Sequence, residues 1–462
     1  VNITASAGDV TTRAGTTINA TTGNVEITAQ TGNIQGGVES TSGDVTLTAT
    51  GETLAVGNIS GNTVSVTANS GTLTTKAGST IKGTESVTTS SQSGEINGDI
   101  NAENGAVTVT AKNGALNVAN ITSKTVGLTA NNGALTTKAS STINATDGVT
   151  TSSQSGNIGG TISGNTVNVA TTGGLTTQAG SKIEAKSGEA NITSATGTIG
   201  GTISGNTVNV TANTGSLTIK DGAKVEATDG AATLTAESGK LTTQTGSSIT
   251  SNKGKTTLTA NNSDIAGNIN ATDVTLNTTG TLTTATSSSI NAASGTLAIN
   301  AKDAKLNGAA SGDRTVVNAT NASGSGSVTA KTSSSVNITG DLNTVNGLNI
   351  ISKDGRNTVR LRGKEIEVKY IQPGVASVEE VIEAKRVLEK VKDLSDEERE
   401  TLAKLGVSAV RFIEPNNTIT VNTQNEFTTR PSSQVTISEG KACFSSGNGA
   451  AVCTNVADDG QQ

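Results

Sequence analysis

The chain has 462 residues, of which 15% are charged and 1% are aromatic, and it contains no His, Met or Trp. Without His, the usual general base and the commonest metal ligand are missing, and no Ser-His-Asp or Cys-His triad can form. The net charge of −6 and a pI of about 5.0 argue against nucleic acid as a partner, which needs a basic surface. The composition therefore predicts a protein with no cofactor and no catalytic His.

Residues 1–351 form an internal repeat. An alternating strand that ends in Thr-Ala recurs, and its neighbouring copies are mostly about 18–24 residues apart or double that. The phrase Gly-x-Leu-Thr also recurs, at Gly71–Thr74, Gly133–Thr136, Gly215–Thr218, Gly239–Thr242 and Gly280–Thr283. Longer phrases recur about 41 and 62 residues apart. Ser91–Gly94, for example, is repeated 62 residues later as Ser153–Gly156. A fixed period of this size predicts a solenoid.

The alternation of Val and Thr predicts strands rather than helices. In one example, the three short strands Val45–Ala49, Leu54–Val56 and Val64–Val66 are separated by turns around Gly51 and Gly57–Gly61. A coil of about 20 residues with three strands is typical of a right-handed parallel β-helix, whereas leucine-rich repeats need more Leu. We expect Val, Ile, Leu and Ala to point inward and Thr, Ser and Asn outward. Stacked coils then bury one continuous narrow core, which explains the absence of aromatic residues there.

Some β-helices are polysaccharide-processing enzymes, which need paired carboxylates, basic residues or a metal cluster on one face. The acidic residues of the repeat are scattered instead. Asp44, Asp147, Asp221 and Asp229 each stand beside a turn glycine, which predicts Asx-type turns. The sequence therefore predicts no enzyme and no metal site.

Residues 352–414 break the period, because about two-fifths of them are charged against about a tenth elsewhere. All Pro and aromatic residues lie after position 369. Ser377–Glu380 and Ser395–Glu398 are capping boxes, and Gly406 marks a helix end, so this segment predicts two helices. The predicted strands that follow are Val407–Ile413, Thr418–Asn422 and Val435–Ile437. The charged helices are either a solvated face or a docking surface for a partner.

Residues 415–462 form the predicted tail. The part from Asn416 to Ser438 is polar, and it is either an extended segment that suits a water-filled barrel interior or a final irregular coil of the rod. The only cysteines are Cys443 and Cys453, which makes a zinc site improbable in a chain without His.

The repeat, the Thr/Asn/Gly-rich composition and the segment Ala442–Gly460 resemble the C-terminal part of the high-molecular-weight adhesins of non-typeable Haemophilus. These are filamentous-haemagglutinin-like exoproteins of two-partner secretion. The resemblance implies an adhesin segment on the bacterial cell surface, anchored at the outer membrane in a dedicated β-barrel transporter. It also implies host epithelial surface glycans as partners of the intact adhesin. The alternative is a purely structural stalk with no binding activity of its own. The family's secretion domain is not recognisable and the chain begins at Val1, so we expect a fragment or a processed product.

The resemblance further implies that a disulfide between Cys443 and Cys453 closes the loop that anchors the fibre. A cell-surface protein meets an oxidising compartment, which favours the disulfide. The loop residues in this matching position are Phe444, Ser445, Ser446, Gly447, Asn448 and Gly449. The alternative is a simple staple of the tail.

Asn-x-Ser/Thr sequons occur 14 times. They are Asn2, Asn19, Asn58, Asn120, Asn144, Asn191, Asn209, Asn261, Asn270, Asn277, Asn318, Asn321, Asn337 and Asn416. A chain this rich in Asn, Ser and Thr produces about as many by chance, so the number itself predicts nothing. The resemblance implies that several carry single hexoses added by a dedicated cytoplasmic N-glycosyltransferase.

Overall fold

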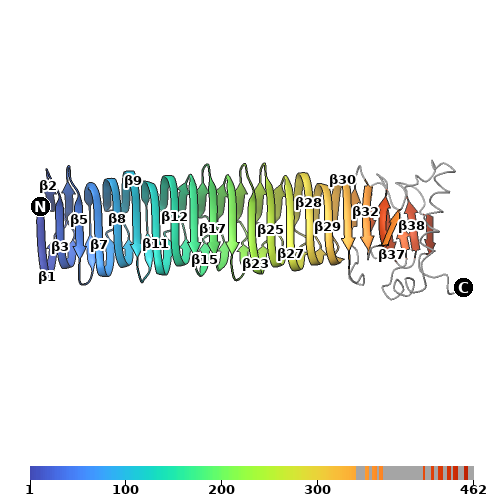
Figure 1. Ribbon diagram of the computed structural model, residues 1–462, viewed down its shortest axis with the longest axis horizontal. Coiled ribbons are helices and arrows are strands. Elements are labelled where there is room, and N and C mark those ends of the chain that lie inside the picture. The colour runs from blue at the N-terminus through green and yellow to red at the C-terminus, as the bar shows by residue number, and fades with distance from the viewer. Residues whose placement is uncertain are drawn as a thin grey trace. The chain divides into compact units, whose positions relative to one another are not determined.

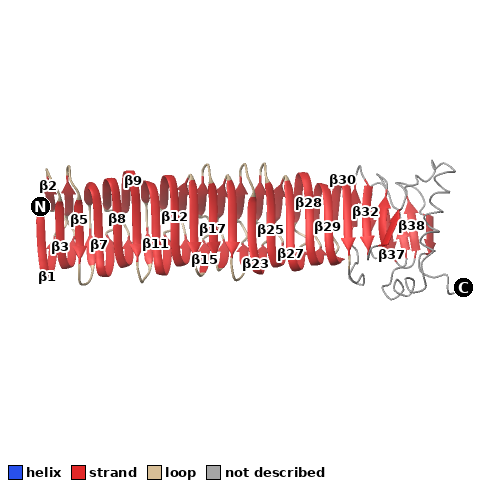
Figure 2. Ribbon diagram, in the orientation of Figure 1, coloured by secondary structure: helices blue, strands red, loops and turns tan. Residues whose placement is uncertain are grey.

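The computed structural model describes residues 1–339 and, after them, residues 349–352, 356–361, 364–367, 409–411, 418–420, 425–429, 434–438, 441–445 and 452–455. The Cα positions group into two units, Val1–Gly230 and Ala231–Gln462. We call them the N-terminal and the C-terminal unit and describe each by itself. The described residues are strands and turns, without a helix (Figure 2).

The N-terminal unit consists of strands stacked side by side (Figure 1, blue to green). Their bounds are β1 (Asn2–Thr12), β2 (Thr17–Ala20), β3 (Val25–Ile34), β4 (Gly37–Ser40), β5 (Val45–Ala49), β6 (Leu54–Val56), β7 (Ile59–Thr75), β8 (Thr80–Ile96), β9 (Asp99–Ala111), β10 (Leu116–Val118), β11 (Ile121–Thr137), β12 (Thr142–Ile158), β13 (Thr161–Gly164), β14 (Thr166–Thr171), β15 (Gly174–Thr177), β16 (Lys182–Ala185), β17 (Glu189–Ser194), β18 (Thr196–Ile199), β19 (Thr202–Gly205), β20 (Thr207–Ala212), β21 (Leu217–Ile219) and β22 (Lys224–Ala227).

Each strand pairs in parallel with the equivalent strand of the next coil. β5 lies between β3 and β7, with Val45 opposite Val25 on one side and Val64 on the other. Paired residues are about 18 to 24 positions apart in the sequence. The prediction of a parallel β-solenoid with coils of about 20 residues is therefore confirmed.

A coil has three sheet faces. Val45–Ala49 lies on the first face and Leu54–Val56 on the second, as predicted. Val64–Val66 is also strand, but it pairs with Val45–Leu47 and so belongs to the first face of the next coil. The third face of this coil begins at Ile59, which pairs with Val38 and with Ile81. Sequence alternation alone missed this third strand because only one apolar residue marks it.

The interior follows the predicted alternation. In β7, Val64, Val66 and Ala68 are fully buried, whereas Ser65 and Thr67 face outward. Burial of one Val, Leu or Ile side chain stabilises a fold by about 1.5–3 kcal/mol, and here it requires the neighbouring coil. Hydroxyl residues also occur inside, and these depart from the prediction that Thr points outward; Thr75 and Thr137 are examples.

The inward Thr residues at the corner between the second and third faces join neighbouring coils. Ser79 Oγ donates to Lys76 O at 2.5 Å, and Gly98 N of the next coil donates to Thr75 Oγ1 at 3.0 Å. A Cβ atom on Gly98 would lie 2.6 Å from Ser79 O, so only Gly fits against this corner. The same set of a Thr, a Ser or Thr, and a Gly recurs in five other places. They are Thr12, Thr16 and Gly36; Thr137, Ser141 and Gly159; Thr177, Ser181 and Gly201; Thr243, Ser247 and Gly267; and Thr284, Ser288 and Gly308. We call this set the corner lock.

The spacing of these corners accounts for the longer phrases that recur in the sequence. In the N-terminal unit they begin at Thr12, Thr75 and Thr137, about 62 residues or three coils apart, and then at Thr177, about 40 residues or two coils later. Between them lie coils with a shorter corner, such as Val56-Gly-Asn-Ile59.

The C-terminal unit repeats the same coil up to β30. Its strands are β23 (Ala232–Thr243), β24 (Ser248–Ser251), β25 (Lys255–Ile265), β26 (Asn268–Ala271), β27 (Asp273–Thr284), β28 (Ser289–Leu306), β29 (Ala309–Ser323), β30 (Ser327–Ile338), β31 (Asn349–Ser352), β32 (Arg356–Leu361), β33 (Lys364–Glu367), β34 (Ala409–Arg411), β35 (Thr418–Thr420), β36 (Asn425–Thr429), β37 (Gln434–Ser438), β38 (Lys441–Ser445) and β39 (Val452–Asn455). Leu258 in β25 pairs with Leu276, and Leu276 with Ile299, so one apolar row runs through the stack.

Beyond β30 the pairing is mixed. β31 continues the parallel ladder from β30 and pairs antiparallel with β35, and β37, β38 and β39 are antiparallel neighbours. The two helices predicted within residues 377–405 lie outside the described residues. The division at residue 230 falls inside the region predicted as one repeat, and the predicted boundaries after 351 and 414 stay predictions.

Candidate functional site

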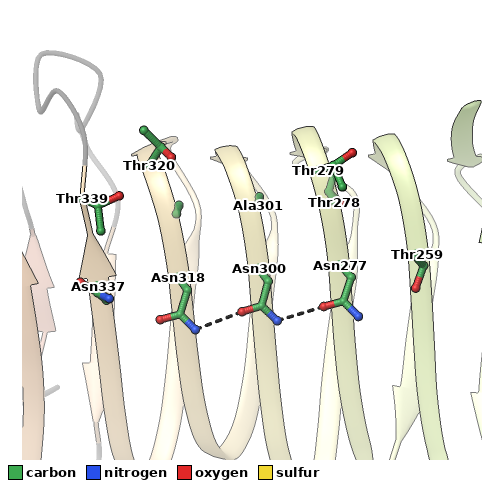
Figure 3. Close-up of a pocket in the computed structure, with 11 residues that line it drawn as sticks. Thr259, Asn277, Thr278, Thr279, Asn300, Ala301, Asn318, Thr320, Asn337 and Thr339 are labelled. Carbon is green, nitrogen blue, oxygen red and sulfur yellow. Dashed lines mark hydrogen bonds between the residues drawn. The ribbon is translucent and has the colours of Figure 1, made fainter. Parts of the chain in front are cut away.

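Outward-facing Asn side chains form a hydrogen-bonded row on the first face of the C-terminal unit (Figure 3). Asn300 Nδ2 donates to Asn277 Oδ1 at 3.0 Å, and Asn318 Nδ2 donates to Asn300 Oδ1 at 3.0 Å. The parallel register places these residues opposite one another, and Asn337 is next in the same column. Neighbouring strands are about 4.8 Å apart, a spacing that lets each amide reach the next. We call Asn277, Asn300, Asn318 and Asn337 the amide row.

The amide row lies in a shallow groove of about 430 Å³. The lining residues are Thr259, Asn277, Thr278, Thr279, Asn300, Ala301, Asn318, Ala319, Thr320, Asn337 and Thr339, and none of them is charged. Such a surface offers hydrogen bonds, and none of its side chains is ionised at neutral pH.

A second row lies in the N-terminal unit. Asn191 Nδ2 donates to Asn168 Oδ1 at 2.9 Å, and Asn209 Nδ2 donates to Asn191 Oδ1 at 2.8 Å. Stacked Asn ladders are expected in a solenoid this rich in Asn, but the sequence did not indicate which Asn residues stack. The signal was present, since Asn follows the second inward residue of the strand in Leu276-Asn277, Ile299-Asn300 and Val317-Asn318.

The predicted glycosylation sequons fall into three groups. Exposed are Asn2, Asn19, Asn58, Asn120, Asn261, Asn270 and Asn318. Half-buried are Asn144, Asn191, Asn209, Asn277, Asn321 and Asn337, and Asn416 lies outside the described residues. The atom that would carry a sugar, Nδ2, already donates a hydrogen bond in Asn120, Asn191, Asn209, Asn318 and Asn321.

Several sequon Asn residues also link neighbouring coils, because their Oδ1 atoms accept hydrogen bonds from the next coil. Asn58 Oδ1 accepts a hydrogen bond from Thr80 N at 2.9 Å, and Asn120 Oδ1 accepts one from Thr142 N at 2.8 Å. Each of these amides replaces a backbone acceptor at a corner of the coil. Such contacts give these Asn residues a structural role that does not depend on modification.

The acidic residues of the repeat do not gather into a reactive site. Asp44 Oδ1 accepts from Thr63 N of the next coil at 3.0 Å, and exposed Asp147 lies 3.9 Å from Lys124 Nζ. Within the described residues, no group of three or more Cys, Asp and Glu side chains could hold a metal ion.

The two cysteines lie opposite one another in an antiparallel pair. Cys443 in β38 pairs with Cys453 in β39, and Phe444 pairs with Val452. Cα atoms of antiparallel partners are about 4.5–5.5 Å apart, within the range of about 4.4–6.8 Å that a disulfide needs. The backbone is compatible with the predicted disulfide. Of the predicted loop, Phe444 and Ser445 belong to β38, and Ser446–Gly449 lie outside the described residues.

Comparisons with known proteins identify no relative: no family model, curated protein or solved structure matches the chain. Across the part of the chain that the structure describes, no helix is long and apolar enough to cross a membrane.

Proposed function

We propose that this chain is the stalk segment of a bacterial surface adhesin of the two-partner secretion class, and that it has no catalytic activity. The observation that carries the proposal is the parallel β-solenoid, in which every coil repeats the same three-faced cross-section. A solenoid extends by adding coils, so it suits a protein that displays a binding tip at a distance from the cell. We further propose that the coils wind right-handed, as nearly all parallel crossover connections do.

The surface of the described coils supports a stalk rather than a binding tip or an enzyme. Val1 is the single large apolar residue exposed among the described residues. The groove along the amide row is uncharged and open, and binding sites are usually concave with convergent polar groups. In this proposal, attachment to host epithelial glycans is a property of the intact adhesin.

Binding of the purified chain separates a stalk from an adhesive segment. The 462-residue chain would be applied to epithelial cells and to a glycan array. The stalk proposal expects no saturable binding. Saturable binding that survives high salt would make the segment itself adhesive.

We also propose that the hairpin of β38 and β39 retains the adhesin in its outer-membrane β-barrel transporter through a Cys443–Cys453 disulfide. Support comes from the resemblance of the tail and from the direct pairing of the two cysteines. The intact adhesin with Cys443→Ser, or the wild type treated with reductant, is expected in the culture medium rather than on the cells. Unchanged cell association in both cases contradicts the anchor and leaves a tail staple.

A dedicated cytoplasmic N-glycosyltransferase is the remaining proposed partner. We expect its hexoses at exposed corner sequons such as Asn58, where a sugar points into solvent. Peptide mapping by mass spectrometry of native material measures this. Native protein without any hexose overturns the proposal, and hexoses confined to the Asn rows would contradict the assignment to corners.

A further inference from the structure

Two neighbouring hydroxyl groups inside the N-terminal unit have no hydrogen-bond partner in the protein. Thr151 and Ser153 are 1% and 3% exposed, and neither Thr151 Oγ1 nor Ser153 Oγ contacts a donor or acceptor. The register places Thr151 between Leu128 and Val169, both buried and apolar. A hydroxyl in such surroundings is costly unless something satisfies it.

The same feature recurs at the equivalent position three coils earlier. Thr89 is 1% exposed, its Oγ1 also has no partner, and it lies between Val66 and Val109. Both residues belong to the same phrase, Thr-Thr-Ser-Ser-Gln-Ser-Gly. Recurrence of one unpartnered hydroxyl in one repeated phrase indicates a built feature of these coils.

The buried Thr residues of the corner locks show what a satisfied hydroxyl looks like here. Thr137 Oγ1 donates to Gly159 O at 2.7 Å and accepts from Gly159 N at 3.0 Å. Thr151 has no such backbone partner within the same unit.

We infer that the core holds an ordered internal water that bridges Thr151 Oγ1 and Ser153 Oγ, and a second water on Thr89 Oγ1. Residues two apart on one strand are about 6.7 Å apart along the backbone, so one water about 2.8 Å from each oxygen bridges the two hydroxyls when their side chains lean toward one another. Buried waters characteristically satisfy polar groups that the protein leaves unpaired.

Oxygen-17 relaxation dispersion of the full chain tests this inference, because it counts waters that exchange slowly from the interior. The double variant Thr89→Val and Thr151→Val, which keeps side-chain shape, is expected to hold two fewer such waters than the wild type. The matched control is Thr88→Val and Thr150→Val, which changes exposed neighbours in the same strands and is expected to leave the number unchanged.

Equal numbers of slow waters in the wild type and in the inner double variant overturn the inference. Should the inner variant fail to fold, a high-resolution crystal structure of the wild type decides instead. Electron density for a water within hydrogen-bond distance of Thr151 Oγ1 and Ser153 Oγ supports the inference, and a dry, close-packed site there refutes it.

Discussion

At the scale of single residues, the corner locks show how a Thr inside a narrow core is stabilising. Thr75 and Thr137 are buried, yet their hydroxyls form hydrogen bonds with backbone groups of the next coil. A Val at the same position would fill the same volume and remove these hydrogen bonds.

Thr137→Val is therefore expected to destabilise the chain, by about 1–3 kcal/mol in the unfolding free energy. Gly159 O loses its donor in this variant, whereas Gly159 N keeps its hydrogen bond to Thr137 O at 3.0 Å. Urea unfolding followed by circular dichroism measures the change. Thr136→Val, one residue away on the outward side, is the control, and equal stability of the two variants would contradict the role of the hydroxyl.

Two glycines give an equally sharp contrast. A Cβ on Gly98 would lie 2.6 Å from Ser79 O and 2.8 Å from Lys76 O, whereas a Cβ on Gly127 would meet nothing within 4 Å. Gly98→Ala is expected to lower the stability by about 1–3 kcal/mol through overpacking. Gly127→Ala is expected to leave it unchanged or raise it slightly, by restricting the unfolded chain. Urea unfolding measures both variants. If the unfolding midpoint of Gly98→Ala equals that of the control Gly127→Ala, the corner can widen at little cost in free energy.

At the scale of elements, long strands such as β7 and β8 pass over all three faces of the coil, so pairing continues around the corners. Register between coils is set by the inward rows, because a shift of one residue would turn every apolar side chain outward. The outward Asn rows then follow from the register, and each amide lies next to its equivalent.

Asn300→Asp tests how much the amide row adds to the strands that carry it. The carboxylate still accepts from Asn318 Nδ2, but it no longer donates to Asn277 Oδ1 and repels that oxygen. We expect a loss of about 1 kcal/mol in the unfolding free energy. Asn300→Ala removes the hydrogen bonds without adding a charge and so serves as the control. If Asn300→Asp lowers the unfolding free energy no more than Asn300→Ala does, repulsion by the carboxylate contributes nothing.

At the scale of the molecule, each coil contacts only its neighbours, so damage is expected to stay local. Val109→Asp buries a charge without a partner in the middle of the N-terminal unit, where Val109 pairs with Thr89 and Leu128. Limited proteolysis is expected to cut this variant in the coils next to β9, while Thr108→Asp, which faces outward, stays resistant. Cleavage spread evenly along the chain would indicate cooperative unfolding instead.

The sequence by itself determined the period, the strand pattern and the inward and outward sides, because a period of two residues inside a period of about 20 leaves few other arrangements. It also predicted the pairing partners Cys443 and Cys453, which the register places opposite one another, although their disulfide stays a prediction. The inward orientation of Val64 and Val66 was predicted correctly, because apolar side chains are stabilised only by burial in the core.

Only the tertiary structure decided which polar residues meet. Thr75 and Gly98 are 23 positions apart, and nothing local to either residue indicates the hydrogen bond between them. The sequence could not distinguish Thr137, whose hydroxyl binds the next coil, from Thr151, whose hydroxyl finds no protein partner. The physical reason is that burial of an apolar residue depends only on whether its side of the strand faces the core. A hydrogen bond depends in addition on the register and the corner length of the neighbouring coil.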